Sequence, residues 1–237
     1  MPNKPFHKAE LNLWLAHVED STYLLEQETI KLLSLSEKQQ LNAIKSIKRK
    51  REFLLSRALM RHALTQQYGL AKSEWTFVYK KGVAPCISNI PPGTYCSLAH
   101  SDGAICFVTS LFPIGIDIEN RSKKRNFIEL ASGFMNDIEI EQLKNCKTDD
   151  DIATVFYRTW CAKEALYKAT GKSQSAQHKN SSIFHYLNSH SKWHLLGLNL
   201  DPFLLAIATY EDSPLITNLI PFNKGCRGVT TTNFTLG

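Results

Sequence analysis

The chain lacks the features that would place it in a membrane or outside the cell. Its apolar runs fall short of the roughly 18 residues that a membrane-spanning helix needs. Its first twenty residues, MPNKPFHKAELNLWLAHVED, mix acidic and basic side chains and contain no apolar signal core. The six cysteines include no C-x-x-C pair, which favours reduced thiols over disulfides or zinc ligands. These absences predict a cytoplasmic protein without a membrane partner.

The composition is that of a folded protein with either one large domain or two smaller halves. Of its 237 residues, 43% are hydrophobic and 21% are charged, so the chain is too apolar to be disordered. The formal net charge of +6 favours an anionic partner. Nucleic acid, an acidic protein and a phosphorylated cofactor all meet that condition, so the charge alone selects none of them.

Hydrophobic periodicity predicts helices followed by strands in the first part of the chain. Alternating leucines predict an edge strand around residues 11–15. The stretch from Ser36 to Gly69 is typical of helices, with Ser36 and Gln39 as a capping box. A short strand is expected at 75–79. Between residues 94 and 119 we expect three strands, with a turn at Ser101–Gly103 between the first two.

The second part of the chain repeats the order of helices before strands. Helices are predicted over 127–144 and 152–170, and a strand pair within 192–210. We therefore expect an α+β fold of two pseudo-symmetric halves, each a small antiparallel sheet packed on a long helix. The predicted units are an N-terminal half at 1–111, a C-terminal half at 112–220 and a loose tail at 221–237.

Two acids lie in the strand FPIGIDIEN. Ile114, Ile116 and Ile118 alternate with the other residues, so Asp117 and Glu119 face the side opposite the isoleucines. Such acids are either solvated or gathered around a positive charge.

A third acid lies in the helical stretch WCAKEALYK. Glu164 and Lys168 are four residues apart, a spacing that usually means a surface ion pair worth a few tenths of a kcal/mol. Here Lys163 adds a second cation, and Asp117 and Glu119 offer two further carboxylates. Three carboxylates without histidine or thiolate suit Mg²⁺, which often completes its coordination with substrate phosphates. Lysines beside them make the place suitable for a pyrophosphate.

These two stretches together resemble the paired signature of the 4'-phosphopantetheinyl transferases. That signature is G-[IV]-D-[IV]-E followed by [FW]-[SCT]-x-K-E-[AS]-x-x-K, and each defining position is filled here. SLAHSDG resembles the family's N-[IVL]-S-H-S-x-G, and KRKREFLLSRALMR resembles its basic helix. The chain length is similar to that of the monomeric surfactin-synthetase-activating type. The resemblance spans roughly residues 36–210.

The resemblance implies a reaction and a metal. Asp117, Glu119 and Glu164 would hold Mg²⁺ against the pyrophosphate of coenzyme A. The phosphopantetheine arm would move to a serine of an acyl or peptidyl carrier protein, leaving 3',5'-ADP. Lys163 and Lys168 would neutralise the phosphates, with Lys168 nearest the leaving group.

Further roles are implied for acids and bases elsewhere in the chain. Glu139, in FMNDIEIEQL, would be the base for the carrier serine, although a helix-surface acid would fit the same position. His100 and Ser101 would contact the nucleotide end of coenzyme A. Arg51 and Arg57, in the basic helix, would face its 3'-phosphate.

One stretch departs from the family pattern. The family has G-[KR]-P ahead of the histidine strand, whereas this chain has KKGVAPCI, with Ala84 before the proline. Lys80 or Lys81 would then replace the missing base in contacting the nucleotide.

Two other functions remain open on the residues alone. The bases between Lys45 and Arg61 could bind nucleic acid, but no aromatic residues alternate with them and no nucleic-acid motif is present. The acids could also serve a Mg²⁺-dependent hydrolase of phosphoanhydrides, which would consume coenzyme A without a carrier. The resemblance favours transfer by a monomer, without a nucleic-acid partner. It does not indicate whether the carrier serves fatty acid, polyketide or non-ribosomal peptide synthesis.

Overall fold

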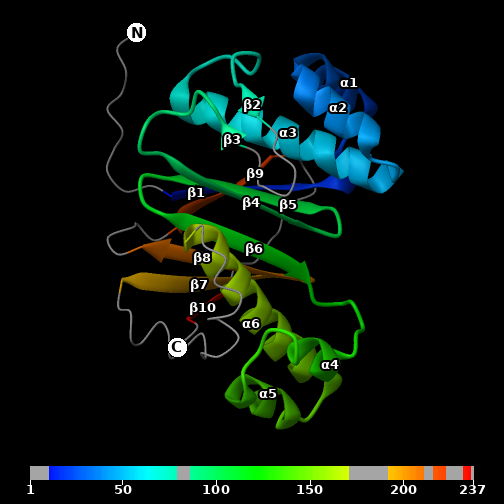
Figure 1. Ribbon diagram of the computed structural model, residues 1–237, viewed down its shortest axis with the longest axis vertical. Coiled ribbons are helices and arrows are strands. Elements are labelled where there is room, and N and C mark those ends of the chain that lie inside the picture. The colour runs from blue at the N-terminus through cyan, green and yellow to red at the C-terminus, as the bar shows by residue number, and fades with distance from the viewer. Residues whose placement is uncertain (1–10, 79–85, 171–191, 211–215, 223–231, 236–237) are drawn as a thin grey trace.

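Two four-stranded sheets lie face to face, and a helix of 22 residues covers the outer face of each (Figure 1). The computed structural model describes residues 11–78, 86–170, 192–210, 216–222 and 232–235. The strand order is β4-β5-β1-β9 in the first sheet and β10-β7-β8-β6 in the second.

Along the chain, three strands of the first sheet are followed by three of the second, and the last two strands add one to each sheet. The first sheet contains β1 (Leu11–His17), β4 (Tyr95–Ser101), β5 (Ala104–Ser110) and β9 (Ile216–Pro221). The second contains β6 (Ile114–Asn120), β7 (Trp193–Leu200), β8 (Phe203–Tyr210) and β10 (Thr232–Thr235). A separate antiparallel hairpin is formed by β2 (Phe77–Val78) and β3 (Cys86–Ile87).

The helices lie at the two ends of the molecule in Figure 1. Around the first sheet are the 3-10 turn η1 (Val18–Asp20), α1 (Tyr23–Leu32), α2 (Leu35–Ala43) and α3 (Ile47–Tyr68). Around the second are α4 (Phe127–Ala131), α5 (Asp137–Lys144) and α6 (Asp149–Thr170). Among these described helices, none is both long enough and apolar enough to cross a membrane.

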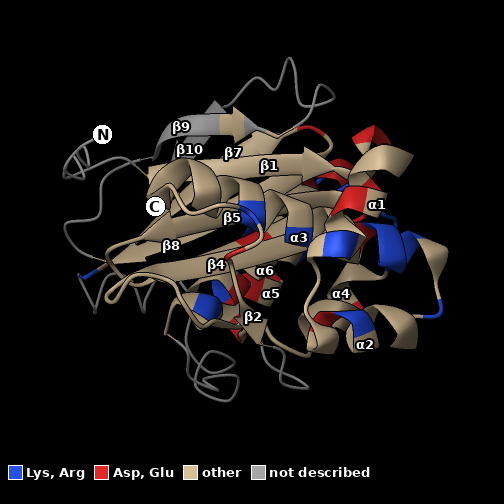
Figure 2. Ribbon diagram, turned by 90° about the horizontal axis from the view of Figure 1, so that it is seen from above, with Lys and Arg blue, Asp and Glu red and all other residues tan. Residues whose placement is uncertain are grey.

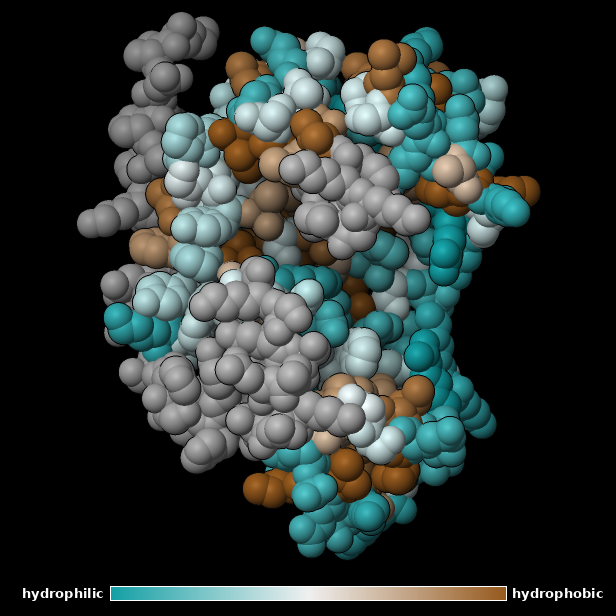
Figure 3. Space-filling view, in the orientation of Figure 1, coloured by the Kyte–Doolittle hydropathy of each residue, from teal (hydrophilic) through white to brown (hydrophobic). Residues whose placement is uncertain are grey.

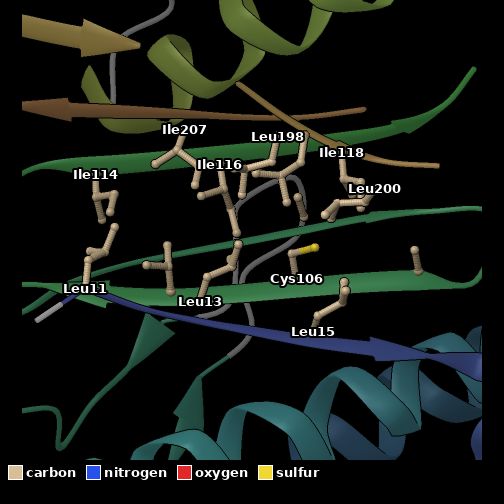
Figure 4. Packing of buried hydrophobic residues seen from close by; sticks show 14 residues of the cluster. Leu11, Leu13, Leu15, Cys106, Ile114, Ile116, Ile118, Leu198, Leu200 and Ile207 are labelled. Atoms are coloured by element: carbon tan, nitrogen blue, oxygen red, sulfur yellow. The ribbon is translucent and has the colours of Figure 1, made fainter. Parts of the chain in front are cut away.

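The main core lies between the two sheets (Figure 4). Because side chains alternate along a strand, the leucines of β1 and the isoleucines of β6 point towards each other from opposite sheets. Ile114, Ile116 and Ile118 are at most 3% exposed. The alternation in FPIGIDIEN therefore places Asp117 and Glu119 on the other face of β6, towards α6.

Helix α6 approaches β6 very closely. The contact between α6 and the second sheet is built from small side chains, including Ala162, Ala165, Ala206 and Ala208. At Gly115 a Cβ would lie 1.9 Å from the carbonyl oxygen of Ala165, so only glycine fits there. This close approach sets the distance between the acids of β6 and the side chains of α6.

The α+β fold predicted from the sequence is confirmed, with a long helix on each sheet. The second sheet is antiparallel throughout, as expected, but the first contains a parallel pair, β1 with β9. The prediction that the first strand is an edge strand is wrong, because β1 lies between β5 and β9. The division at 111/112 stays a prediction, although β9, assigned to the second half, pairs in the first sheet.

Local boundaries differ from the sequence prediction in three places. The N-cap of α2 is Ser34 with Glu37 as its capping-box partner, in place of Ser36 with Gln39. The single helix expected over 127–144 is two helices, because Asn136 caps α5 and interrupts it. The tail expected to be loose contains β10, which pairs with β7.

Replacing Gly115 with alanine is expected to destabilise the fold by about 3 kcal/mol, because the added methyl group meets backbone atoms that cannot rotate away. The free energy of unfolding in urea measures the loss. Gly133→Ala is the control: its Cβ would lie 3.2 Å from the nearest atom, so we expect less than about 1 kcal/mol there. Equal losses in the two variants would contradict the close helix contact.

Candidate active site

A cavity of about 620 Å³ opens between the helices α2 and α3 and the ends of β4 and β6. Its walls come from α2, α3, the end of β4, the end of β6 and the residues that follow β6. Figure 3 shows that the molecule narrows between its upper and lower parts, and that hydrophilic residues (teal) border this narrowing. The cavity wall carries four basic residues: Arg49, Arg57, Lys123 and Arg125.

The turn between β4 and β5 forms one wall of the cavity. His100 and Ser101 both line it, and Asp102 follows them with a φ of 49°. The nucleotide contact that the family resemblance implies for His100 and Ser101 stays a prediction. Gly103 then takes a φ of 91°, which glycine adopts without strain. This tight turn leaves the last side chains of β4 facing the end of β6.

Asp117 is the most buried of the three predicted metal ligands. Its side chain lies under α6, where Lys168 Nζ donates a hydrogen bond to Oδ1 at 2.7 Å. The second oxygen, Oδ2, is buried without a hydrogen-bond partner. Burial raises the pKa of Asp117 to about 6, Lys168 opposes this shift, and the nearby charges of Glu119 and Glu164 add to it.

Glu119, on β6, and Glu164, on α6, both lie close enough to Asp117 for their charges to raise its pKa. Ser101 Oγ donates a hydrogen bond of 2.7 Å to Glu119 Oε2. Glu119 also lines a second cavity of about 90 Å³, whose walls are mostly aromatic and include Phe134, Phe156 and Trp160. Glu164 is half-buried, and its charge reaches Asp117. The structure thus places Asp117 within electrostatic range of both other carboxylates that the sequence singled out.

The side chains of Asp117, Glu119 and Glu164 are chemically suited to bind a hard divalent cation. All three offer carboxylate oxygens, and the unpartnered Oδ2 of Asp117 lacks the positive partner that a buried carboxylate requires. Lys168 stands against the other oxygen and supplies part of the missing charge. Within the described residues, no three His, Cys, Asp or Glu side chains are grouped tightly enough to form a metal cluster. A bound cation would therefore require small side-chain movements.

Glu139 and Lys163 are placed away from the three carboxylates and bind each other. Lys163 Nζ lies 2.5 Å from Glu139 Oε2 and also donates to the carbonyl oxygen of Phe134 at 2.9 Å. Glu139 is 1% exposed, and it accepts a hydrogen bond from the backbone N–H of Asn136 at the start of α5. The pair joins α5 to α6. The roles predicted for Glu139 as base and Lys163 as phosphate contact stay predictions.

The two arginines predicted to bind phosphate lie in different places. Arg51 donates to Glu26 Oε1 at 2.9 Å and to backbone carbonyls near η1, away from the cavity lining. Figure 2 shows this neighbourhood, with blue segments of α3 beside red segments of α1. Arg57 does line the cavity, and its guanidinium lies over the ring of Phe53. Lys80 and Lys81 lie outside the described residues.

A buried charge cluster behind Arg57 was missed by the sequence analysis. Glu37 is fully buried and pairs with Arg57 at 3.0 Å and with Arg61 at 2.7 Å. One carboxylate thus serves two guanidinium groups. Burial lowers the pKa of Arg57 to about 10, against the favourable effect of Glu37 and with a contribution from Arg61. The cluster leaves one positive charge uncompensated at the cavity wall, which favours binding of an anion.

The basic residues that follow β6 were also missed. Lys123 and Arg125 line the cavity and belong to the run RSKKRN, which comes directly after the two acids in the sequence. A cluster of bases one residue beyond a carboxylate pair is a signal that could have placed them at the same site.

The chain is similar to one protein family and to several curated proteins. The family model described as the 4'-phosphopantetheinyl transferase superfamily matches residues 113–208. The 4'-phosphopantetheinyl transferase Sfp of Bacillus subtilis is 28% identical over 182 residues, which cover 72% of this chain and 80% of Sfp. The 4'-phosphopantetheinyl transferase HetI of Nostoc sp. is also 28% identical, over 72% of each chain. A third relative, the 4'-phosphopantetheinyl transferase ffp of Bacillus subtilis, is 30% identical over about half of each chain.

The matched range begins just before β6 and ends within β8. It includes β6 and α6, the two elements that carry the three carboxylates. Over this range the chain is similar to the 4'-phosphopantetheinyl transferase superfamily, and over about 72% of its length it is similar to two curated transferases of that name.

Proposed function

We propose that this protein transfers the 4'-phosphopantetheine arm of coenzyme A to a serine of an acyl or peptidyl carrier protein, in a Mg²⁺-dependent reaction that releases 3',5'-ADP. One observation carries the proposal. Glu119 lines a large cavity with four basic residues, its charge and that of Glu164 reach the buried Asp117, and Lys168 is bound to Asp117. The curated relatives are named for the same transfer. The protein would act as a monomer in the cytoplasm.

The basic cavity is suited to the nucleotide of coenzyme A. Arg49, Arg57, Lys123 and Arg125 line it, and the uncompensated charge of the Arg57 cluster is only partly solvated. An anion at this place would be attracted more strongly than by fully hydrated lysines, because the surroundings are less polar than water. His100 offers a ring nitrogen to the same space.

Charge neutralisation is the main task of the protein in phosphoryl transfer. Asp117, Glu119 and Glu164 would hold the Mg²⁺ ion, which supplies positive charge to the pyrophosphate oxygens when bound. Lys168 lies 2.7 Å from Asp117, so its ammonium group stands within reach of the leaving phosphate. Ser101 holds Glu119 through its hydroxyl, which limits the rotation of that carboxylate.

The carrier protein would approach from the side of the aromatic cavity. That cavity shares Glu119 and Arg125 with the basic one, so a serine entering it would lie next to the metal ligands. The bases between Arg121 and Arg125 lie beside it and suit an acidic partner.

The surroundings of Glu139 favour a positioning role over that of a catalytic base. Its carboxylate is buried, lies 2.5 Å from the Lys163 ammonium, and lines neither of the two cavities. It joins α5 to α6 through Lys163 and thereby fixes the wall of the aromatic cavity at Phe134, whose carbonyl Lys163 also binds.

The transfer itself is tested by the intact mass of a purified apo carrier protein after incubation with this protein, coenzyme A and Mg²⁺. We expect the carrier to gain the mass of one phosphopantetheine arm, and 3',5'-ADP to appear in equal amount. Glu164→Gln should abolish the gain, because it removes one carboxylate of the metal site. Turnover of coenzyme A without any carrier would indicate a hydrolase and would contradict the proposal.

Stabilisation by Mg²⁺ should depend on pH through Asp117. Its pKa in the folded protein, about 6, lies above its ordinary value of 3.8. The folded state therefore binds the proton more tightly, and the metal-free protein loses stability as pH rises between those values. Mg²⁺ needs the ionised carboxylate, so its affinity should fall by up to about tenfold per pH unit below pH 6.

Thermal unfolding with and without Mg²⁺ measures this effect between pH 5 and 7.5. Asp117→Asn should show no increase of the Mg²⁺ effect across that range. An equal rise in Tm at pH 5 and pH 7.5 in the unaltered protein would rule out Asp117 as the titrating ligand.

Glu139→Gln should lower the free energy of unfolding by about 3 kcal/mol, because it leaves the buried Lys163 ammonium without its carboxylate. The acidic limb of the pH profile of kcat should remain. Glu141→Gln, which alters an exposed acid on the same helix, should change neither quantity. Loss of the acidic limb in Glu139→Gln alone would instead assign the base to Glu139.

A further inference from the structure

The two sheets meet along β4 and β6, which run side by side but belong to different sheets. Each is the edge strand of its own sheet, so no backbone ladder joins them. Edge strands carry backbone N–H groups that need other partners, and a buried one without a partner is costly.

Side chains supply the links between these two strands. Ser97 Oγ, on β4, accepts a hydrogen bond of 3.0 Å from the backbone N–H of Ile116 on β6. Further along, Ser101 Oγ donates to Glu119 Oε2 at 2.7 Å. Beyond the ends of the strand pairing, Asn120 Nδ2 donates to Asp102 Oδ2 at 2.8 Å. We name these three hydrogen bonds the β4–β6 links.

The link at Ser97 is the most buried of the three and lies closest to Asp117. Ser97 is 7% exposed and Ile116 is fully buried, so water cannot replace the hydroxyl. Ile116 lies between Gly115, which is pressed against α6, and Asp117. The hydrogen bond therefore fixes the peptide that carries the deepest of the three carboxylates.

We propose that Ser97 is a positioning residue for the metal site. Its hydroxyl holds β6 at one position along β4, and this sets Asp117 and Glu119 against Glu164 and the basic cavity. The inference rests on the proposed function, because it concerns the same carboxylates. A purely structural serine would stabilise the fold without affecting the affinity for a divalent cation.

The affinity for Mn²⁺, used in place of Mg²⁺, distinguishes these two roles. It is measured by calorimetry and by electron paramagnetic resonance, in the absence of coenzyme A and carrier protein. Ser97→Ala should weaken Mn²⁺ binding by about tenfold, the lower end of the range for residues that orient metal ligands. Ser97→Thr, which keeps the hydroxyl, should restore the affinity to within about threefold.

Thr109→Val is the matched control for loss of a buried hydroxyl in the same sheet. Thr109 is 1% exposed and donates to Gln67 on α3, on the side away from β6. The Thr109→Val variant should have a lower Tm than the unaltered protein and the same affinity for Mn²⁺. Equal weakening in Thr109→Val and Ser97→Ala would overturn the inference, and so would an unchanged affinity in Ser97→Ala or a failure of threonine to restore it.

Asn120→Ala tests the same idea if Ser97→Ala does not fold. Asn120 is only half-buried, and its removal breaks the outermost of the β4–β6 links. A smaller loss of Mn²⁺ affinity, about threefold, is expected, and no loss would overturn the inference. Absence of Mn²⁺ binding in the unaltered protein would instead count against the metal site of the proposed function.

Discussion

The contact between Gly115 and α6 is the constraint on which the site depends. Because a side chain at this position would occupy the place of the Ala165 carbonyl, the helix can lie directly on the strand only with glycine there. Two residues further along β6 is Asp117, and one residue before Ala165 is Glu164. The distance between these carboxylates is thus set by backbone packing, which is stiffer than any arrangement of long side chains.

The arrangement also holds a carboxylate where burial disfavours its charged form. Asp117 is buried under α6 with one oxygen lacking a partner. An ordinary protein core would carry an apolar residue at such a position and would gain stability from it. The buried carboxylate is therefore unfavourable to the metal-free fold and favourable to binding a cation, which is common in functional sites.

Local patterns in the sequence were sufficient to predict the parts of the site that lie on single elements. The alternation in FPIGIDIEN placed Asp117 and Glu119 on the face away from the core, and the structure confirms this. Contacts between distant elements were not predictable in the same way. Glu37 serves two arginines of α3, and nothing in the spacing of α2 indicates that its carboxylate turns inward. The pairing of Lys163 with Glu139 depends on Asn136 being the N-cap of α5. The N-x-x-E capping pattern for this was present in the sequence.

The parallel pairing of β1 with β9 joins two segments from nearly opposite ends of the chain. During synthesis, β1 emerges early and must wait for almost the whole chain before its second neighbour exists. Until then its outer edge presents free backbone groups that can pair with any extended segment. The first sheet is begun at the N-terminus but is completed only when β9 has been made, and a fragment ending before residue 216 would keep one side of β1 open to association with other chains.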